Sequence, residues 1–525
     1  MKKYLEKLNK ILSDKKITEI IFIVILLGVS MYTRFYNLGY SDYIGDEHKA
    51  FIELEEGQSY SDFFMSKRKG PMQFLVSQIP YLITGDLRNE LAERIPFSIA
   101  SVASVLVFYF VVKKLTKNSQ VAAFIAAFLL AVNGFMVGFG RIAQYQNLNL
   151  LFSFLALFFY ADLIAKKPSV KANYLKSSLL GTFFWCLSML SHWDAVFILP
   201  VVAIIFLRYL RNAGVSKNEK TKLLVINVVF GCLVLLPFLV PYTGFQASYE
   251  ENMTYFGRRI ELGYFNFERY KLLTELYNPF VTFYALCGLG LLGMFLVKKS
   301  YMFTSWFLFA YLSFEFFVRK PGTHIYNFVI PATILSALAI TQIFKVLPKA
   351  ARYVWAAVVV LVLAFLFYQT HYIFIDHAKE YPWEQKTFVD FHDIQEKYYK
   401  KKKVKTRDRV YTSITTPKYN INQKLPLFGF PHKRYWNEIN DYIQQENAEA
   451  GETLAYSTNE VKTISEWYIE APYGAERPYY LVGIKKPLSF FNDYKFPQIG
   501  RKSTIHEIEN EFGVTVVRIY KVRDE

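Results

Sequence analysis

The first 372 residues alternate between long apolar blocks and short polar segments. Each block is long enough to cross a hydrocarbon core, which takes roughly 20 helical residues. A helix satisfies its own backbone hydrogen bonds, which lipid cannot do for it. We therefore predict eleven membrane-spanning helices, at 17–34, 92–112, 119–138, 143–164, 174–191, 195–210, 222–241, 277–297, 301–318, 325–345 and 352–372.

Lysine and arginine are concentrated in every second connection between these blocks. They occur in the N-terminal tail and at 113–117, 166–171, 208–222, 298–299 and 345–352. Positively charged loops stay on the cytoplasmic side of a membrane, so we predict a cytoplasmic N-terminus and an extracytoplasmic C-terminus. No small-residue cleavage motif follows the first block, which we interpret as a retained span.

Residues after 372 are no longer apolar enough to span a membrane. Apolar and polar residues alternate at 479–483 and 514–520, as is typical of strands, and 436–445 is predicted to be a helix. The predicted fold is a polytopic α-helical membrane domain over 1–372, with long outer loops at 35–91 and 242–276. A soluble extracytoplasmic α/β domain follows at 373–525.

Composition agrees with this division. Hydrophobic residues make up 53% of the 525 positions, and the net charge is +17. Much of the basic charge flanks the apolar blocks, where it sets topology, so we predict no nucleic-acid partner. The three cysteines lie inside apolar blocks, which excludes a disulfide framework or a zinc motif built on cysteine spacing.

Two adjacent carboxylates, Asp46 and Glu47, stand in the first outer loop, followed by His48. One could act as a general base while the other orients a substrate. The alternative is a solvated pair that caps a helix. Arg141, at the outer end of the fourth span, could bind a phosphate or could extend to the membrane interface.

Further outer segments carry ionisable groups. His192 and Asp194 form a tight turn between two spans, where they could be functional or could simply pair to close the turn. Arg258, Arg259, Lys320 and His324 are basic residues on the outer side, against the topology bias. They suit an anionic substrate, or alternatively lipid headgroups. Together these groups suit transfer from a lipid phosphate, whose leaving group needs charge stabilisation while the acceptor hydroxyl needs a base.

The order of these features resembles the GT-C membrane glycosyltransferases, in particular the protein O-mannosyltransferase and aminoarabinose-transferase branch. The resembling motifs are Asp46-Glu47 in the first outer loop, Lys69-Gly70-Pro71 before an amphipathic segment at 72–83, Arg94-Ile95-Pro96 and Arg141-Ile142-Ala143. The chain departs from the family pattern in two places. It has Gln144-Tyr145-Gln146 where relatives carry an acidic residue, and the turn 191–194 replaces a turn that contains lysine.

The resemblance implies an inverting transferase in the cell membrane that moves a sugar from a polyprenyl-phosphate donor to a protein, lipid or glycan acceptor. Asp46 would be the catalytic base, and Glu47 would orient the acceptor or the base. Arg141, Arg258, Arg259, Lys320 and His324 would hold the donor phosphate, while His48, Lys69, His192 and Asp194 would shape the site. Asp46, Glu47 and Asp194 offer oxygen ligands for a divalent metal, but the resemblance implies none, so we predict no cofactor.

Two other classes of function remain open from the sequence. A transporter or lipid-handling protein would show ionisable residues at mid-depth and internal repeats, whereas here the charges gather at one face. A non-catalytic scaffold for the cell envelope would use the C-terminal domain, which lacks a nucleophile or metal motif.

Overall fold

The computed structural model describes most of the chain as two compact units. The described residues are 14–67, 69–117, 119–165, 174–245, 250, 253–254, 257, 260, 266–279, 286–297, 300–319, 321–378, 380–382, 427–474, 478–487 and 502–522. The helical unit consists of Met1–Tyr36, Ala50–Ile83 and Ile95–Thr370. The mixed unit consists of Asn37–Lys49, Thr84–Arg94 and His371–Glu525.

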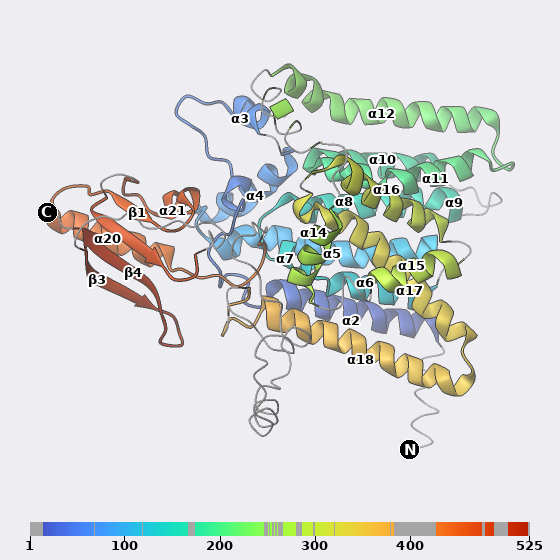
Figure 1. Ribbon diagram of the computed structural model, residues 1–525. Coiled ribbons are helices and arrows are strands. Elements are labelled where there is room, and N and C mark those ends of the chain that lie inside the picture. Colours follow the sequence, from blue (N-terminus) through green and yellow to red (C-terminus); the bar gives the residue numbers. More distant parts are fainter. Residues whose placement is uncertain are drawn as a thin grey trace, which may run out of the picture. The chain divides into compact units, whose positions relative to one another are not determined.

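The helical unit is built from long helices that run alongside one another (Figure 1). The helices and 3₁₀ turns that lie wholly or mainly in this unit are, in chain order, α2 (Lys15–Phe35), α3 (Tyr60–Ser66), α4 (Met72–Thr84), α5 (Glu90–Leu115), α6 (Gln120–Ala131), α7 (Gly134–Phe139), α8 (Tyr145–Tyr160), α9 (Asp162–Ala165), α10 (Tyr174–Ser191), the 3₁₀ turn η2 (Trp193–Ile198), α11 (Leu199–Leu210), α12 (Lys217–Gly244), α14 (Phe267–Tyr277), α15 (Cys287–Leu296), α16 (Tyr301–Phe317), the 3₁₀ turn η4 (Gly322–Ile325), α17 (Tyr326–Val346) and α18 (Lys349–Phe374).

Within the described residues, seven helices are long and apolar enough to cross a membrane. They are Lys15–Phe35, Glu90–Leu115, Tyr145–Ile164, Trp193–Leu210, Lys217–Gly244, Gly322–Val346 and Lys349–Phe374. The chain is therefore a multi-pass membrane protein, as predicted. The count of eleven spans and the orientation of the two ends stay predictions.

One predicted span, 119–138, is two helices in the structure. α6 ends at Ala131 and α7 begins at Gly134, with Asn133 accepting a hydrogen bond from the amide of Phe135 at 3.1 Å. The carboxamide of Asn278 accepts from the amide of Gly134 at 2.6 Å. These two asparagines satisfy amides that start a helix, and so the break is built into the chain.

Small and polar residues join the helices. A Cβ on Gly293 of α15 would lie 2.2 Å from the carbonyl oxygen of Leu335 of α17, so only glycine allows this approach. Between α8, α10 and α12, the Thr182 hydroxyl contacts the Tyr160 hydroxyl at 2.9 Å and the Asn227 carboxamide at 2.6 Å. Interhelical hydrogen bonds of this kind supply association energy where lipid surrounds the helices.

The mixed unit contains a four-stranded sheet in the order β1-β2-β4-β3. β1 (Tyr456–Thr458) runs parallel to β2 (Tyr480–Ile484), while β4 (Thr515–Val522) is antiparallel to both β2 and β3 (Lys502–Glu509). Helix α21 (Lys462–Tyr468) lies in the connection between β1 and β2. The helix predicted at 436–445 is present as α20 (Trp436–Ala450), and the predicted strands are β2 and β4.

Apolar side chains from α20 and the central strands form the core of this unit. Trp436, Ile439 and Ile443 project at helical spacing from α20 and are buried, as are Val482 of β2 and Ile519 of β4. Two pieces from the N-terminal region also belong to this unit: 37–49, within the first predicted loop, and 84–94, which joins the end of that loop to the start of the second predicted span. The division made from the sequence assigned both pieces to the membrane domain.

Candidate functional site

The candidate residues fall in both units. Asp46, Glu47 and His48 belong to the mixed unit, together with Arg94. Lys69, Arg141, His192, Asp194 and His324 belong to the helical unit. Arg258, Arg259 and Lys320 lie outside the described residues. The convergence of all these groups in one site stays a prediction.

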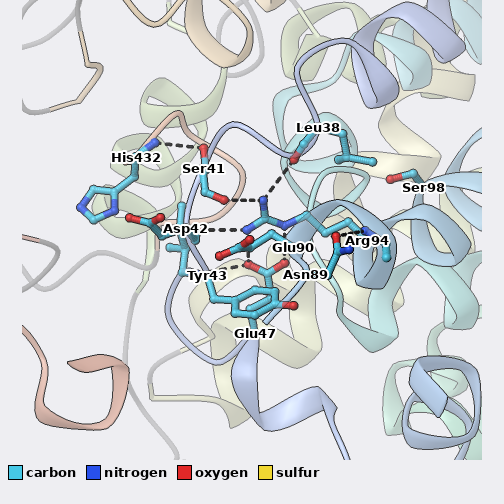
Figure 2. Close-up of polar contacts among 12 residues, drawn as sticks. Leu38, Ser41, Asp42, Tyr43, Glu47, Asn89, Glu90, Arg94, Ser98 and His432 are labelled. Atoms are coloured by element: carbon cyan, nitrogen blue, oxygen red, sulfur yellow. Dashed lines mark hydrogen bonds and ion pairs between the residues drawn. The ribbon is translucent and has the colours of Figure 1, made fainter. Parts of the chain in front are cut away.

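A buried ion pair organises the loop that carries the two adjacent carboxylates. Arg94 Nε donates to Glu47 Oε1 at 2.6 Å, and Nη2 donates to Oε2 at 2.9 Å (Figure 2). The same guanidinium donates to the backbone carbonyls of Leu38, Ser41 and Asp42 at 2.7 to 3.1 Å. A buried charge pair is tolerated when its hydrogen bonds are bidentate and its remaining donors also have acceptors. Glu47 and Arg94 therefore hold the loop in one shape.

Asp46 differs from its neighbour in exposure. Its side chain is about half exposed, and its Oδ1 lies 2.8 Å from Lys49 Nζ. Gly45 before it has a φ of +62°, a conformation that favours glycine and turns the chain just before the carboxylates. Asp46 is therefore accessible from solvent, whereas the buried Glu47 stabilises the conformation of the loop through its ion pair with Arg94. His48 lies beside the ring of Trp467 in the same unit, with ring centroids 6.0 Å apart.

A second set of buried contacts attaches this loop to the segment before α20. The amide of Asp42 donates to the carbonyl of His432 at 3.0 Å, and the amide of His432 donates to the Ser41 hydroxyl at 3.0 Å (Figure 2). The amide of Arg434 donates to the Asp42 carboxylate. Burial raises the pKa of Asp42 to about 7, and the hydrogen bond from Arg434 opposes that rise.

Asp42, His432 and Arg434 were not among the residues predicted for the site. Arg434 is fully buried and donates to both oxygens of Glu380, at 2.7 and 3.0 Å. Burial lowers the pKa of His432 well below its ordinary value, and nearby Arg434 adds to the effect. No local pattern in the sequence predicts these contacts, because the identity of a polar loop residue does not indicate whether another segment will bury it.

In the helical unit, Asp194 receives contacts from three side chains. Its Oδ1 lies 3.1 Å from His192 Nδ1, and its Oδ2 lies 2.8 Å from His324 Nδ1. The hydroxyl of Tyr326 donates to the same Oδ2 at 2.6 Å. The structure thus brings together His192, which precedes η2, Asp194 of η2 and His324 of η4. It adds Tyr326 of α17, which was not among the predicted site residues.

The turn before η2 is held in place from α8. The Asn149 carboxamide donates to the carbonyls of Ser188 at 3.1 Å and His192 at 3.0 Å. The ring of Tyr145 stacks on that of His192 with centroids 4.0 Å apart. Burial lowers the pKa of His192, so its imidazole is biased toward the neutral form.

Lys69 lies in a small pocket beside this turn. The pocket is also lined by His192, Trp193 and Tyr242, with apolar residues of α10 and α12. Lys69 Nζ lies 5.5 Å from the centroid of the Tyr145 ring, within range of a cation–π interaction. A Cβ on Gly70 would lie 1.9 Å from the carbonyl oxygen of Leu190, so glycine is required for this segment to reach the end of α10.

Arg141 is buried at the end of α2. It donates to the carbonyls of Thr33 at 3.3 Å and Tyr36 at 2.9 Å, which are among the last carbonyls of that helix. This contact satisfies part of a helix end. The alternative of an arginine extended to the interface does not fit its burial, and its role as a phosphate ligand stays a prediction.

Comparison with protein families adds an independent observation. Residues 68–240 match the family described as dolichyl-phosphate-mannose-protein mannosyltransferase. The matched stretch contains Lys69, Arg141, His192 and Asp194. It covers less than half of the chain, and over these residues it confirms the resemblance inferred from the sequence. No curated protein matches the chain.

Three solved structures illustrate how distant the similarity is. ArnT from Cupriavidus metallidurans bound to undecaprenyl phosphate is 12% identical, with a TM-score of 0.46, over 69% of this chain and 66% of that one. The Archaeoglobus fulgidus oligosaccharyltransferase is 16% identical, with a TM-score of 0.47, over 90% and 70%. The Saccharomyces cerevisiae Pmt1–Pmt2 complex bound to the sugar donor is 15% identical, with a TM-score of 0.33, over 46% and 36%.

Proposed function

We propose that this chain is an inverting membrane glycosyltransferase that moves a sugar from a polyprenyl-phosphate donor to an acceptor hydroxyl on the extracytoplasmic face. The observation that carries the proposal is the match of residues 68–240 to the mannosyltransferase family. The multi-pass architecture supports it, because a donor with a polyprenyl chain stays in the bilayer and its enzyme must meet it there. A protein, a lipid or a glycan could supply the hydroxyl.

The reaction requires one base and one anion site. The acceptor oxygen attacks the anomeric carbon as the bond from that carbon to the phosphate oxygen breaks, which inverts the anomeric centre. The lipid phosphate leaves with the bonding electron pair, and the hydroxyl proton passes to Asp46. The half-exposed carboxylate of Asp46 can reach a substrate, and Lys49 Nζ lies 2.8 Å from its Oδ1.

Other residues take supporting roles in the proposal. Glu47 positions Asp46 through its pair with Arg94. Lys69, in its pocket beside His192, and Arg141 offer positive charge for the phosphate, as do Arg258, Arg259 and Lys320, and His324 is the remaining predicted phosphate ligand. A departing phosphate needs charge stabilisation more than protonation. No cofactor is needed for this step.

The test uses the full chain in lipid, incubated with radiolabelled polyprenyl-phosphate sugars and an envelope extract that supplies acceptors. Asp46→Asn is expected to lower transfer by about 10²- to 10⁴-fold, the usual contribution of a general base, while donor binding persists. Glu56→Gln, an exposed carboxylate later in the same loop, serves as the matched control and should transfer normally.

Two other outcomes would count against the proposal. If no donor gives transfer with the wild type and donor binding is also absent, transport or scaffolding becomes the better explanation. If transfer is normal in Asp46→Asn, the chain is a transferase but its base lies elsewhere.

A further inference from the structure

His192, Asp194 and His324 present donor atoms suited to a transition metal. One such atom from each residue lies within 4.8 Å of the other two. The closest pairs are 3.1 Å for His192 Nδ1 and Asp194 Oδ1, and 2.8 Å for His324 Nδ1 and Asp194 Oδ2. Tetrahedral zinc ligands at about 2.0–2.2 Å from the ion stand roughly 3.3 Å apart. The three side chains therefore need only small movements to surround an ion.

His192 Nδ1 faces two partners on Asp194. It lies 3.2 Å from the amide of Asp194, from which it accepts a hydrogen bond, and 3.1 Å from Asp194 Oδ1. A ring nitrogen that accepts a hydrogen bond carries one lone pair, and a metal ion would take that lone pair in exchange for the amide hydrogen bond. The carboxylate oxygen beside it would then bind the same ion.

The chemistry of the donors selects the class of ion. Two imidazole nitrogens with one carboxylate oxygen suit zinc and other first-row transition metals, whereas magnesium and calcium take oxygen ligands. The surroundings also resemble the outer shell of a metal site. Tyr326 donates to Asp194 Oδ2 at 2.6 Å, and the side chains of all three candidate ligands are at most 20% exposed.

We propose that His192, Asp194 and His324 bind one divalent transition-metal ion, zinc by preference. The ion would tie the turn before η2 to η4, which are separated by 130 residues in the chain. Three protein ligands leave a fourth position for water or an anion. The inference departs from the sequence-based expectation of no metal, and it stands whether or not the chain transfers sugar.

The test measures metal content directly. The full chain, purified in detergent with an affinity tag that contains no histidine, is dialysed against metal-free buffer and analysed by mass spectrometry of the elements. One transition-metal ion per chain is expected for the wild type. His324→Gln and Asp194→Asn should each lose it, while His506→Gln, a histidine of β3 in the other unit, should retain it.

A second measurement does not depend on the variants folding. Wild-type protein is stripped with a chelator and titrated with Co²⁺, whose visible absorption reports tetrahedral coordination. A saturable spectrum that Zn²⁺ abolishes and Mg²⁺ does not would support the site. The proposal is overturned if the wild type holds no more metal than His324→Gln and the stripped protein gives no such spectrum.

Discussion

Two buried carboxylates, one in each unit, are compensated in different ways. Glu47 in the mixed unit is paired with a guanidinium, while Asp194 in the helical unit meets two imidazoles and a phenol. An arginine is always charged and its fork fits a carboxylate, so the Glu47–Arg94 pair is permanent. Imidazoles can be neutral or can exchange a hydrogen bond for a metal. The first arrangement suits a fixed loop, and the second suits a site that binds.

The largest expected effect comes from breaking the permanent pair. Arg94→Met leaves the buried Glu47 charge without its partner, which costs about 3–5 kcal/mol in comparable buried pairs. We expect residues 37–49 of the mixed unit to unfold locally. Hydrogen exchange measured on the full chain should then show faster exchange of the amides in 37–49. Arg88→Met removes an exposed partner of Glu470 and should cost less than about 1 kcal/mol, which makes it the matched control.

The double variant sharpens this prediction. Glu47→Leu together with Arg94→Met removes both charges, so it should recover part of the stability lost in Arg94→Met. Equal exchange rates in the single and double variants would show that the ion pair is not what holds the loop.

A smaller effect is expected from the equivalent change in the helical unit. Asp194→Asn leaves no stranded charge, because neutral histidines can still bond to the amide. With a chelator present to remove any metal, we expect a loss of about 1–2 kcal/mol, typical of weakened hydrogen bonds. The stability of Asp194→Asn is compared with that of Arg94→Met by thermal unfolding of the purified chain, with size-exclusion chromatography as the readout. A loss as large as that of Arg94→Met would contradict the distinction drawn between the two carboxylates.

The smallest effect is a dependence on pH within the mixed unit. Because folding raises the pKa of Asp42, the protonated carboxyl stabilises the folded state. This contribution is fully present below the unfolded-state pKa of 3.8 and is lost as the pH rises through about 7. The lowered pKa of His432 gives stability that is present above about 6.5 and lost as pH falls. Between pH 5.5 and 7 the two contributions oppose each other, so the wild type should depend little on pH.

Single variants separate these contributions. In Asp42→Asn, stability should rise with pH over this window, and in His432→Gln it should fall, each by at most about 1.4 kcal/mol per pH unit. Hydrogen exchange of α20 at several pH values provides the measurement. If the stability of both variants changed with pH in the same direction, other groups would set the pH dependence.

The candidate site was only partly predictable from sequence. Lys69, His192, Asp194 and His324 could be picked out because polar residues between apolar blocks have few reasons to be there. The contact between Asp194 and His324 could not, since it depends on how η2 and η4 are packed. Arg94 was noticed as part of a motif, but its partner Glu47 lies 47 residues away. Tyr326 and Asn149 lie within apolar helices, where a single polar residue does not indicate its partner.

The amino-acid sequence by itself determined that the chain crosses a membrane several times and roughly where seven of its long apolar helices lie. It did so because the apolar length needed to cross a bilayer is a local property of the chain. Only the tertiary structure decided that Glu47 is buried while Asp46 is half exposed, and that Asp194 lies between two histidines. Burial and partner choice arise from segments far apart in the chain, and no local pattern records which of them will meet.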